Sequence, residues 1–376
     1  MNTSDIYQRY QRQISLREIG EAGQQKLSLA KVLVIGAGGL GCPALQYLAA
    51  AGVGTLGIVD YDIVDISNLH RQILYSVDDI GKPKAEIAAN KVKTLNPEIE
   101  VQTFIMKLDN QNAFHIIAGF DLVLDGTDNF ASRYLINDAC VLLKKPLVYG
   151  AVLRFEGQVG VFNLADKVTG RSANYRDLFP EPPDPDSVLS CNKAGVLGVV
   201  PGIIGMLQAT EAIKIIAGVN EVLCNQIVNY NMLSNEFYKF NISPTEESIN
   251  LIPKSETEFL KFDYDWFCNR HNANDEIAAE ELDVLISNGK IRIIDVREKN
   301  ELPLVNEFSH SQIPFSSIES IISSIDSSDT IVVFCQTGSR SAKTVKFLRA
   351  EISGCKAFSL SGGILAWKKL HQIISN

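Results

Sequence analysis

One short segment near the N-terminus restricts the fold more than any other. Residues 31–35 (KVLVI) form a continuous apolar run, residues 36–41 (GAGGLG) follow at once, and residues 41–51 have helical periodicity. Such a run is typical of a parallel strand buried on both faces, and the glycines predict a tight turn from strand to helix. A second strand is expected over residues 55–60, so the segment predicts the first unit of a doubly wound sheet.

The alternation of strands and helices continues to about residue 240 and predicts two α/β domains. Further strands and helices are expected at residues 83–95, 100–105, 121–125, 131–143, 146–151, 157–162, 195–217 and 226–240. The composition changes over residues 241–255, and a smaller strand–helix pattern begins near residue 258. We therefore predict a doubly wound, Rossmann-like domain over residues 1–242, a linker over 243–275 and a smaller α/β domain over 276–376.

Length, charge and cysteine usage exclude several classes of protein. The chain has 376 residues, more than one hydrophobic core usually serves, and a net charge of −9. An acidic chain without a basic stripe matches nucleic acid poorly, because neutralising phosphates supplies most of that affinity. The polar start has no secretory h-region, and the apolar stretches at 44–54 and 195–207 are broken by glycine, so we expect no membrane partner. Seven dispersed cysteines without a C-x-x-C pair predict reduced thiols and a cytoplasmic protein.

The glycine turn has the spacing of a phosphate site. Its glycines match G-x-G-x-x-G between a strand and a helix, where backbone N–H groups and the helix N-terminus attract an anion. Asp60 ends the next strand, where a carboxylate can accept hydrogen bonds from a ribose. These two features alone also fit an NAD-dependent oxidoreductase, and the turn alone fits a helix that merely packs on a strand.

Two cations further along the chain favour ATP over NAD. Arg71 lies in a polar segment, Ser67–Gln72, and Lys84 opens the next predicted helix. Cleavage of ATP between its α- and β-phosphates needs such charges, because negative charge builds up on the transferring phosphorus and on pyrophosphate. A hydride carrier does not need this pair, although either residue alone could be an ordinary solvated side chain.

A third polar group, residues 125–129 (DGTDN), ends another strand on the expected ligand edge of the sheet. Asp128 is placed to bind Mg²⁺, which would neutralise the phosphates. Asn129 is a further candidate for nucleotide binding, but Asn129 and Thr127 are also well suited to cap the following helix.

The motifs follow one another in a characteristic order: RYQRQ (9–13), GAGGLG (36–41), DYD (60–62), SNLHRQ (67–72), GKPK (81–84), DGTDN (125–129) and SCNKAGVLG (190–198). Over residues 1–240 the chain resembles the ubiquitin-activating-enzyme-like family, and most closely its MoeB/ThiF type, the adenylyltransferases of molybdopterin and thiamine biosynthesis. Members of that family are homodimers that attach AMP to the C-terminal glycine carboxylate of a ubiquitin-like sulfur carrier protein of the MoaD or ThiS type.

The resemblance implies a role for individual residues. Asp60 would bind ribose, Asn68, Arg71 and Lys84 would bind phosphates, Asp128 would bind Mg²⁺, and Arg12 would reach into the site of the partner subunit. The nucleotide-binding set that we expect is Gly36, Gly38, Gly39, Gly41, Asp60, Asp62, Ser67, Asn68, Arg71, Gln72, Lys84, Asp128 and Asn129. Cys191 lies where some members form a covalent link with the carrier and others have a dispensable cysteine, so it is a candidate catalytic residue.

One departure from the family concerns zinc. Many members carry two C-x-x-C pairs that hold structural zinc, but the first place here is Asn174-Tyr175-Arg176-Asp177, and no second pair precedes the linker. Four thiolates make a closed zinc site, whereas Asn and Asp at these places do not. We therefore expect ATP and Mg²⁺ as cofactors and no zinc.

The smaller domain has a motif of its own. Residues 335–340 (CQTGSR) follow a predicted strand and enter a helix, so successive N–H groups form an anion-binding nest around Cys335, and Arg340 adds positive charge. Together with DVRE (295–298) and LSGGILAW (360–367), this pattern resembles the rhodanese family, whose members carry sulfur as a persulfide on this cysteine. The segment SQIPF (311–315) departs from the family's usual H-I-P-G-A.

The two domains together predict one reaction sequence. The first would adenylate the carrier, and a persulfide on Cys335, loaded by a donor such as a cysteine desulfurase, would convert the acyl-adenylate into a thiocarboxylate. The alternatives are an NAD-dependent oxidoreductase, a non-catalytic carrier-binding scaffold, and a carrier-activating enzyme of another pathway such as tRNA thiolation. The motifs do not separate molybdopterin from thiamine biosynthesis.

Overall fold

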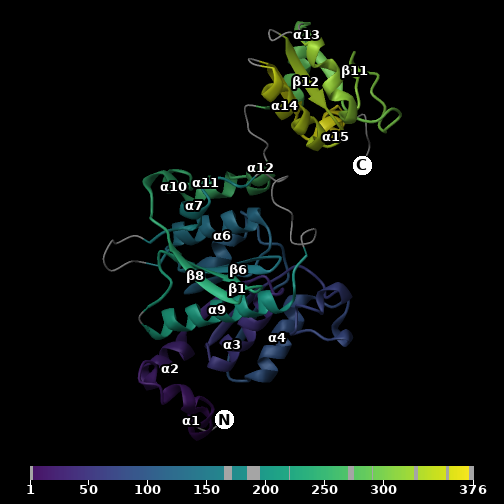
Figure 1. Ribbon diagram of the computed structural model, residues 1–376. Helices are drawn as coiled ribbons and strands as arrows, with labels where there is room; N and C mark the ends of the chain where they lie inside the picture. The colour runs from purple at the N-terminus through teal and green to yellow at the C-terminus, as the bar shows by residue number, and fades with distance from the viewer. Residues whose placement is uncertain are drawn as a thin grey trace. The chain divides into compact units, whose positions relative to one another are not determined.

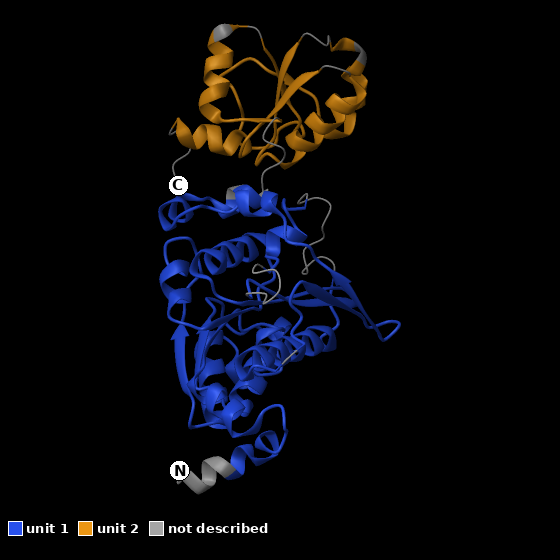
Figure 2. Ribbon diagram, turned by 90° about the vertical axis from the view of Figure 1, so that its left-hand side faces the viewer, with its two compact units in different colours: residues 1–269 blue, residues 270–376 orange. Residues whose placement is uncertain are grey.

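The computed structural model divides the chain into two compact units, Met1–Asn269 and Arg270–Asn376 (Figure 2). Each unit has its own sheet and its own hydrophobic core. The residues that the structure describes are 3–164, 172–183, 195–219, 221–269, 275–289, 291–325, 329–352 and 355–371.

The first unit is built on an eight-stranded sheet in the order β3-β2-β1-β4-β5-β6-β7-β8. Figure 1 labels β1, β6 and β8 of this sheet. Its strands are β1 (Lys31–Ile35), β2 (Thr55–Val59), β3 (Glu100–Phe104), β4 (Leu122–Asp125), β5 (Leu147–Leu153), β6 (Glu156–Phe162), β7 (Gln226–Asn231) and β8 (Glu236–Asn241). The first five strands in the sheet order are parallel, and the last three continue it antiparallel. The predicted doubly wound fold is confirmed, with an antiparallel extension at one edge.

Alternate side chains of β1 enter two different cores. Val32 and Val34 pack in a cluster with residues of α3 (Gly41–Ala51), α4 (Lys84–Leu95) and α9 (Val199–Ala217). Leu33 and Ile35 pack in a second cluster with α5 (Ala113–Ala118) and α6 (Phe130–Leu143). Helices therefore cover both faces of the sheet, which is why this strand is a continuous apolar run. The remaining elements before residue 240 are α1 (Thr3–Ile14), α2 (Gly20–Leu29), η1 (Ile66–Asn68), η2 (Val77–Asp79) and α7 (Tyr175–Leu178).

Helix α9 is long and apolar enough, by length and composition alone, to cross a membrane. In this fold it packs against α3, β5 and β6. Val200, Ile204 and Ala212 on this helix are fully buried. Its apolar composition therefore has a sufficient explanation in the core of the first unit.

The first part of the predicted linker, residues 243–275, is folded. Three short helices, α10 (Glu246–Asn250), α11 (Glu256–Lys261) and α12 (Tyr264–Asn269), belong to the first unit, and α11 and α12 pack on α6. Phe259 and Tyr264 are buried there. Helices of five or six residues show too little periodicity to be recognised in a sequence, so the structure moves the division of the chain to residue 269.

The second unit has a parallel sheet of five strands in the order β11-β10-β12-β13-β9. The strands are β9 (Glu276–Ile277), β10 (Arg292–Asp295), β11 (Ser311–Gln312), β12 (Thr330–Phe334) and β13 (Lys356–Leu360). The helices are α13 (Ala279–Asn288), η3 (Phe315–Ser324), α14 (Ser339–Glu351) and α15 (Gly363–Leu370). The predicted smaller α/β domain is confirmed, and its central strand, β12, carries four consecutive buried residues.

Candidate functional site

The glycine turn between β1 and α3 depends on close backbone contacts. Gly36 has a φ of +91°, and a Cβ on it would lie 2.7 Å from the carbonyl oxygen of Gly126. A Cβ on Gly41 would lie 1.9 Å from the carbonyl oxygen of Gly36. Since a side chain fits neither place, both positions require glycine. The same contacts hold the turn against the end of β4, where the segment DGTDN begins.

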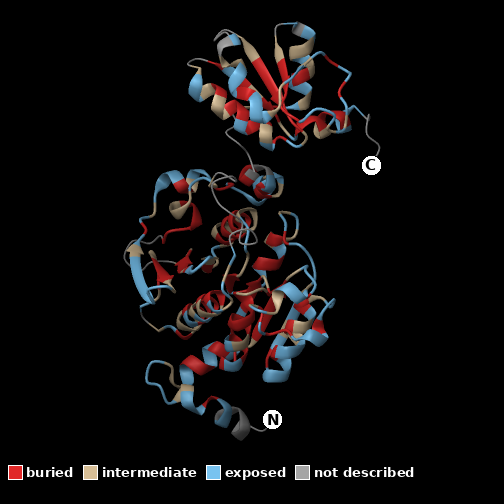
Figure 3. Cartoon of the chain, turned by 45° about the vertical axis from the view of Figure 1, so that its right-hand side comes forward, coloured by how far each residue is buried: buried red, intermediate tan, exposed pale blue. Residues whose placement is uncertain are grey.

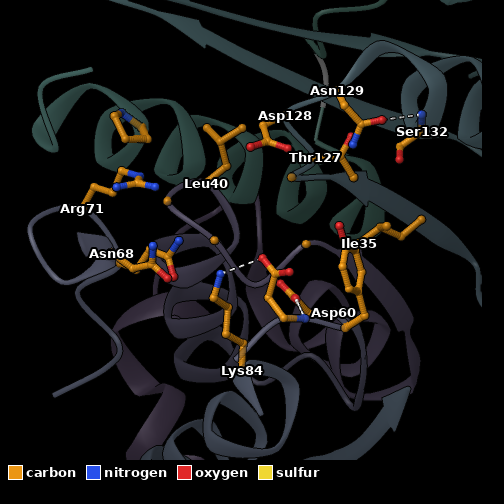
Figure 4. A pocket seen from close by; sticks show the side chains of 18 of the residues that line it. Ile35, Leu40, Asp60, Asn68, Arg71, Lys84, Thr127, Asp128, Asn129 and Ser132 are labelled. Carbon is orange, nitrogen blue, oxygen red and sulfur yellow. Dashed lines mark hydrogen bonds and ion pairs between the residues drawn. The ribbon is translucent and has the colours of Figure 1, made fainter. Parts of the chain in front are cut away.

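This turn forms one wall of a cavity of about 660 Å³ (Figure 4). The volume lies in the range that is typical of small-molecule sites. Twelve of the expected nucleotide-binding residues line it: Gly36, Gly38, Gly39, Asp60, Asp62, Ser67, Asn68, Arg71, Gln72, Lys84, Asp128 and Asn129. Gly41 is not among the lining residues, because it is the first residue of α3 behind the turn.

Two cations reach this cavity from different elements, as Figure 4 shows. Lys84, the first residue of α4, is 5 % exposed, and its Nζ lies 2.9 Å from Oδ2 of Asp62. Arg71 follows η1, and its Nη1 donates to the Ser67 carbonyl oxygen at 2.9 Å. A guanidinium has five N–H donors, so this contact orients Arg71 and still leaves donors for an anionic ligand. The cavity thus has an ammonium and a guanidinium close to the glycine turn.

Asp60 connects the end of β2 to the glycine turn. Its Oδ2 accepts from the N–H of Ala37 and its Oδ1 from the N–H of Asp62, both at 2.8 Å. Burial raises the pKa of Asp60 above its ordinary value, although these two N–H donors act in the opposite direction. Each carboxylate oxygen has a further lone pair, so Asp60 can hold the turn and accept from a ribose hydroxyl at the same time.

The segment DGTDN divides its side chains between structure and cavity. Thr127 donates from its N–H and its hydroxyl to Oδ1 of the buried Asp125, at 2.9 and 2.6 Å. Asn129 is the N-cap of α6, and its Oδ1 accepts from the N–H of Ser132 at 2.9 Å. The cap therefore occupies the side-chain oxygen of Asn129, even though the residue lines the cavity. Asp128 is exposed at the cavity and is the carboxylate of this segment that can meet a ligand.

Asp128 suits Mg²⁺ only together with a phosphate ligand. Among the described residues, no group of three or more His, Cys, Asp and Glu side chains is arranged to hold a metal ion. Mg²⁺ is usually bound by one or two carboxylates, with water and substrate phosphates completing its six ligands. The exposed carboxylate of Asp128 at this cavity fits that arrangement.

Further residues line the cavity that the sequence patterns did not indicate. Arg133 is 9 % exposed, and its Nη2 donates to the Thr127 carbonyl oxygen at 3.2 Å. Arg133 follows the cap residue Asn129 by four positions, so the two lie on the same face of α6. This spacing could have indicated from the sequence that Arg133 lies near the site. Most of the other unexpected lining residues come from loops or strand ends, and Pro201 comes from the first turn of α9. They include His70, Met106, Lys107, Leu108, Thr127, Val152, Gly195, Val196 and Pro201.

Besides Gly41, two expected site residues of the first unit are not among those that line this cavity. Arg12 is exposed on α1 and is not among the lining residues. Cys191 lies outside the described residues, so the structure does not test its role. Gly195 and Val196, which follow Cys191 closely in the chain, do line the cavity.

The place where many family members begin a zinc site holds a polar network instead. Asn174 and Asp177 form a capping box around α7. Arg176 makes a two-point ion pair with Asp138, with N–O distances of 2.9 and 2.7 Å, and both side chains are fully buried. Asp177 also accepts from the hydroxyl of Ser248 in α10 at 2.6 Å. These contacts tie α6, α7 and α10 together.

In the second unit, Cys335 lies between the end of β12 and the start of α14. The residue is 1 % exposed, the N–H of Gly338 donates to its Sγ at 3.2 Å, and the Ser341 hydroxyl lies 3.6 Å from it. Burial raises the pKa of the Cys335 thiol, but hydrogen bonds from Ser341, Thr337 and Gly338 outweigh burial and hold this pKa below its ordinary value. The loop therefore favours a thiolate, the form that acts as a nucleophile.

Arg340, which is expected to add positive charge at this loop, lies in the first turn of α14 and has a carboxylate partner. Its guanidinium pairs with the carboxylate of Glu301, with Nη1 2.9 Å from Oε2. Glu301 belongs to a segment that is held by Arg297, which pairs with Asp295 at 2.7 Å and donates to the Pro303 carbonyl oxygen at 2.8 Å. The DVRE motif thus supports the segment that neutralises Arg340.

The chain matches two protein-family models, the ThiF family over residues 10–251 and the rhodanese-like domain over residues 278–370. It is 42 % identical over 374 residues to "Probable adenylyltransferase/sulfurtransferase MoeZ" of Mycobacterium tuberculosis, with 97 % of this chain and 93 % of that protein covered. It is 38 % identical over 383 residues to "Adenylyltransferase and sulfurtransferase MOCS3" of Drosophila sechellia, covering 97 % and 83 %. It is also 47 % identical over 240 residues to "Sulfur carrier protein adenylyltransferase" of Thermus thermophilus, covering 64 % and 89 %.

Solved structures of MccB from E. coli share the fold. The structure of MccB with ATP aligns with a TM-score of 0.53 at 25 % identity, over 60 % of this chain and 67 % of that one. The structure of MccB with MccA-N7isoASN aligns with a TM-score of 0.55 at 23 % identity, over 64 % and 72 %. An identity this low shows a common fold and leaves the chemistry to the residues of the site.

Proposed function

The chain belongs to the ThiF family and carries a rhodanese-like domain, and from this premise we propose that it activates a sulfur carrier protein with ATP and then transfers sulfur to it. It is an adenylyltransferase and sulfurtransferase, the class named for its relatives MoeZ and MOCS3. The observation that carries the proposal is the meeting of Arg71, Lys84 and Asp128 around one cavity at the glycine turn.

In the first step, the C-terminal carboxylate of the carrier attacks the α-phosphorus of ATP. The bond from the α-phosphorus to the oxygen that bridges it to the β-phosphate breaks, which gives an acyl-adenylate and pyrophosphate. Arg71 and Lys84 stabilise the negative charge that develops, and Lys84 has Asp62 as its partner until a phosphate takes that place. Asp60 orients the ribose. Asp128 would hold Mg²⁺, which supplies further positive charge at the phosphates when bound.

In the second step, a persulfide on Cys335, loaded by a donor such as a cysteine desulfurase, attacks the carbonyl of the acyl-adenylate. AMP leaves, and an acyl disulfide joins the carrier to Cys335. A second thiol then attacks Sγ of Cys335, so that the carrier leaves as a thiocarboxylate and a disulfide remains, which a cellular thiol reductant opens. Cys191 is the candidate for that thiol, because the segment after it lines the ATP cavity.

Relatives support a sulfur carrier protein as the substrate and favour the molybdopterin pathway. One relative, from Thermus thermophilus, is named for a sulfur carrier protein. Another, from Porphyra purpurea, is 40 % identical over 376 residues and is named "Probable molybdopterin-synthase adenylyltransferase".

The alternative of an NAD-dependent oxidoreductase accounts for fewer of the residues at the site. Such an enzyme would use the glycine turn and Asp60, but it would need neither Arg71 nor Lys84 for hydride transfer. None of the six described cysteines forms a disulfide, and a cytoplasmic location is part of the proposal.

A homodimer is part of the same proposal. Arg12 is exposed on α1 and does not line the cavity of its own chain, so a role in ATP binding requires the cavity of a second copy. Sedimentation velocity on the full chain should give the mass of a dimer. A monomer with full adenylation activity would contradict this part of the proposal.

The exchange of radiolabelled pyrophosphate into ATP tests the first step. Exchange should require a carrier that ends in glycine and should be absent with a carrier that lacks this residue. Lys84→Ala should slow exchange by about 10²-fold or more, the usual cost of removing one group that stabilises a charged transition state. Lys82→Ala is the matched control, because Lys82 is exposed and does not line the cavity. Equal exchange by the two variants, or full exchange with the shortened carrier, would remove the proposal.

A further inference from the structure

Two buried serines connect the sheet of the second unit to the sulfur of Cys335. Ser341 lies in the first turn of α14 and Ser359 lies on β13, and both are fully buried. Ser359 Oγ donates to Ser341 Oγ at 2.9 Å, and Ser341 Oγ lies 3.6 Å from Sγ of Cys335. The two hydroxyls and the sulfur therefore form a continuous chain of buried polar atoms, and Cys335 packs in a hydrophobic cluster with Ile331, Val333 and Val345.

Ser341 has one proton and two acceptors within reach. Its Oγ lies 2.9 Å from the Gly338 carbonyl oxygen as well as 3.6 Å from the sulfur. A hydroxyl donates once and accepts twice, and the bond from Ser359 satisfies the oxygen of Ser341 as an acceptor. The Ser341 proton can therefore turn to either acceptor. A carbonyl is a better acceptor than a neutral thiol, but a charged sulfur makes the stronger bond, so the direction follows the charge on Cys335.

Gly338 links the same hydroxyl to the nest around the sulfur. Its carbonyl oxygen accepts from Ser341, and its N–H donates to Sγ of Cys335 at 3.2 Å. The bond from Ser341 to the Gly338 carbonyl oxygen therefore helps to orient the Gly338 N–H that donates to the sulfur. Ser341 thus acts on the sulfur directly through its hydroxyl and indirectly through the geometry of the loop.

We propose that Ser341 is a catalytic residue of the sulfurtransferase reaction and that Ser359 is its positioning residue, the pair providing a hydrogen bond that turns to the sulfur whenever Cys335 is charged. The inference rests on the proposed function in one respect, that Cys335 carries the sulfur. The lowered pKa of the Cys335 thiol agrees with it, because the Ser341 hydroxyl is one of the donors that outweigh burial.

With thiosulfate as the sulfur donor and cyanide as the acceptor, the reaction needs the charged sulfur twice. The Cys335 thiolate attacks the outer sulfur of thiosulfate, the sulfur–sulfur bond breaks and sulfite leaves. Cyanide then takes the terminal sulfur of the persulfide as thiocyanate, and the thiolate returns as the leaving group. A hydroxyl that follows the charge stabilises the thiolate at the start of the cycle and at its end.

The other charged or titratable groups described around Cys335 either form an ion pair with another side chain or pack against an aromatic ring. Arg340 on α14 is paired with Glu301, and Asp295 at the end of β10 is paired with Arg297. His310 packs against the ring of Phe334, the residue before Cys335. None of these groups changes in a serine variant, so a difference between the pH profiles of serine variants and the unchanged protein reports on the hydroxyls.

The test is the pH dependence of kcat/KM for thiosulfate, measured on the full chain with saturating cyanide. Ser341→Ala should move the inflection up by about one pH unit and slow transfer by about tenfold at pH values below both inflections, since one unit of pKa changes the thiolate fraction tenfold in that range. Ser359→Ala should move it in the same direction by less. The double variant should match Ser341→Ala alone, because Ser359 acts through Ser341.

Conservative and distant variants serve as controls. Ser341→Thr keeps a hydroxyl and should restore the profile, and Ser320→Ala, on an exposed part of η3, should leave it unchanged. An inflection that stays in place in both single variants, or effects that simply add in the double variant, would overturn the inference. These outcomes are separate from a failure of the proposed function, which would appear as sulfur transfer that survives Cys335→Ala.

Discussion

Cys42 and Cys335 both lie beside a turn from a parallel strand into a helix, one in each unit, and their environments are opposite. Cys42 is fully buried in the first turn of α3, and its thiol donates to the Ala37 carbonyl oxygen at 3.3 Å. Burial raises the pKa of Cys42 to about 12. Cys335 accepts hydrogen bonds from its loop, and its pKa lies below the ordinary value. A helix N-terminus therefore does not by itself activate a thiol; the direction of the nearby hydrogen bonds decides.

The two turns also differ in where their charge comes from. The glycine turn has no charged side chain of its own. Its cations are Arg71, which follows η1, and Lys84, the first residue of α4, and both line the same cavity. In the cysteine loop the anion is the thiolate of Cys335. It is stabilised by N–H groups of the loop and by a hydroxyl of the helix that follows. The first arrangement suits a ligand that arrives with its charge, and the second suits a charge that the protein generates.

The contrast between the cysteines should be largest in their reaction with a small alkylating reagent near pH 7. From thiolate fractions alone, Cys335 should react at least about 10³-fold faster than Cys42. Because the pKa of Cys335 is lowered, its labelling should persist at pH values below those at which an ordinary thiol loses reactivity, and should fall only as the pH drops through that lowered pKa. Mass spectrometry of the two peptides measures the ratio.

Labelling in denaturant is the internal control for this ratio. Unfolding removes both environments, so the two cysteines should then react at similar rates. Equal labelling of the folded protein would show that the hydrogen bonds around Cys335 do not activate it.

A smaller effect, still about 10²-fold or more, is expected when a methyl group is added to the glycine turn. Gly41→Ala places a Cβ 1.9 Å from the Gly36 carbonyl oxygen, so the turn must shift and its N–H groups lose their alignment with the phosphates. Pyrophosphate exchange should be largely lost, while sulfur transfer from thiosulfate by the second unit continues. Gly202→Ala in α9 is the control, because a Cβ there meets no atom within 4 Å. A Gly41 variant with normal exchange would show that the turn is not the phosphate site.

The smallest effect is expected at Cys42 itself. Cys42→Ala removes a buried sulfur and should lower the free energy of unfolding by about 1 kcal/mol, with pyrophosphate exchange within about twofold of normal. Unfolding in urea, followed by circular dichroism, measures the first value. A loss of exchange without a loss of stability would assign Cys42 a chemical role and break the contrast with Cys335.

Patterns that depend on near neighbours in the sequence were recognisable without the structure. The apolar run of β1, the spacing of GAGGLG and the strand before Cys335 each report a local conformation, so the fold class and both turns could be predicted. The segment SQIPF differs from the family pattern in its residues, and part of what holds it is backbone: the N–H of Phe315 donates to the Val296 carbonyl oxygen at 3.1 Å. Backbone contacts tolerate such changes of side chain.

Partners that lie far apart in the chain could not be predicted in this way. The pairing of Arg340 with Glu301, the bond from Ser359 to Ser341 and the burial of Arg133 each depend on which elements pack together. The helices α10 to α12 were missed for a related reason, since each is too short to be stable alone and is held by contacts with the first unit.

Taken alone, the amino-acid order determined the two α/β sheets, the glycine turn, the reactive cysteine and a set of candidate ATP-binding residues, because periodicity and motif spacing act over a few neighbouring residues. Only the tertiary structure decided which charges face a ligand and which are already paired. Packing in three dimensions decides which side chains become partners. A parallel sheet brings together the ends of strands that are far apart along the chain.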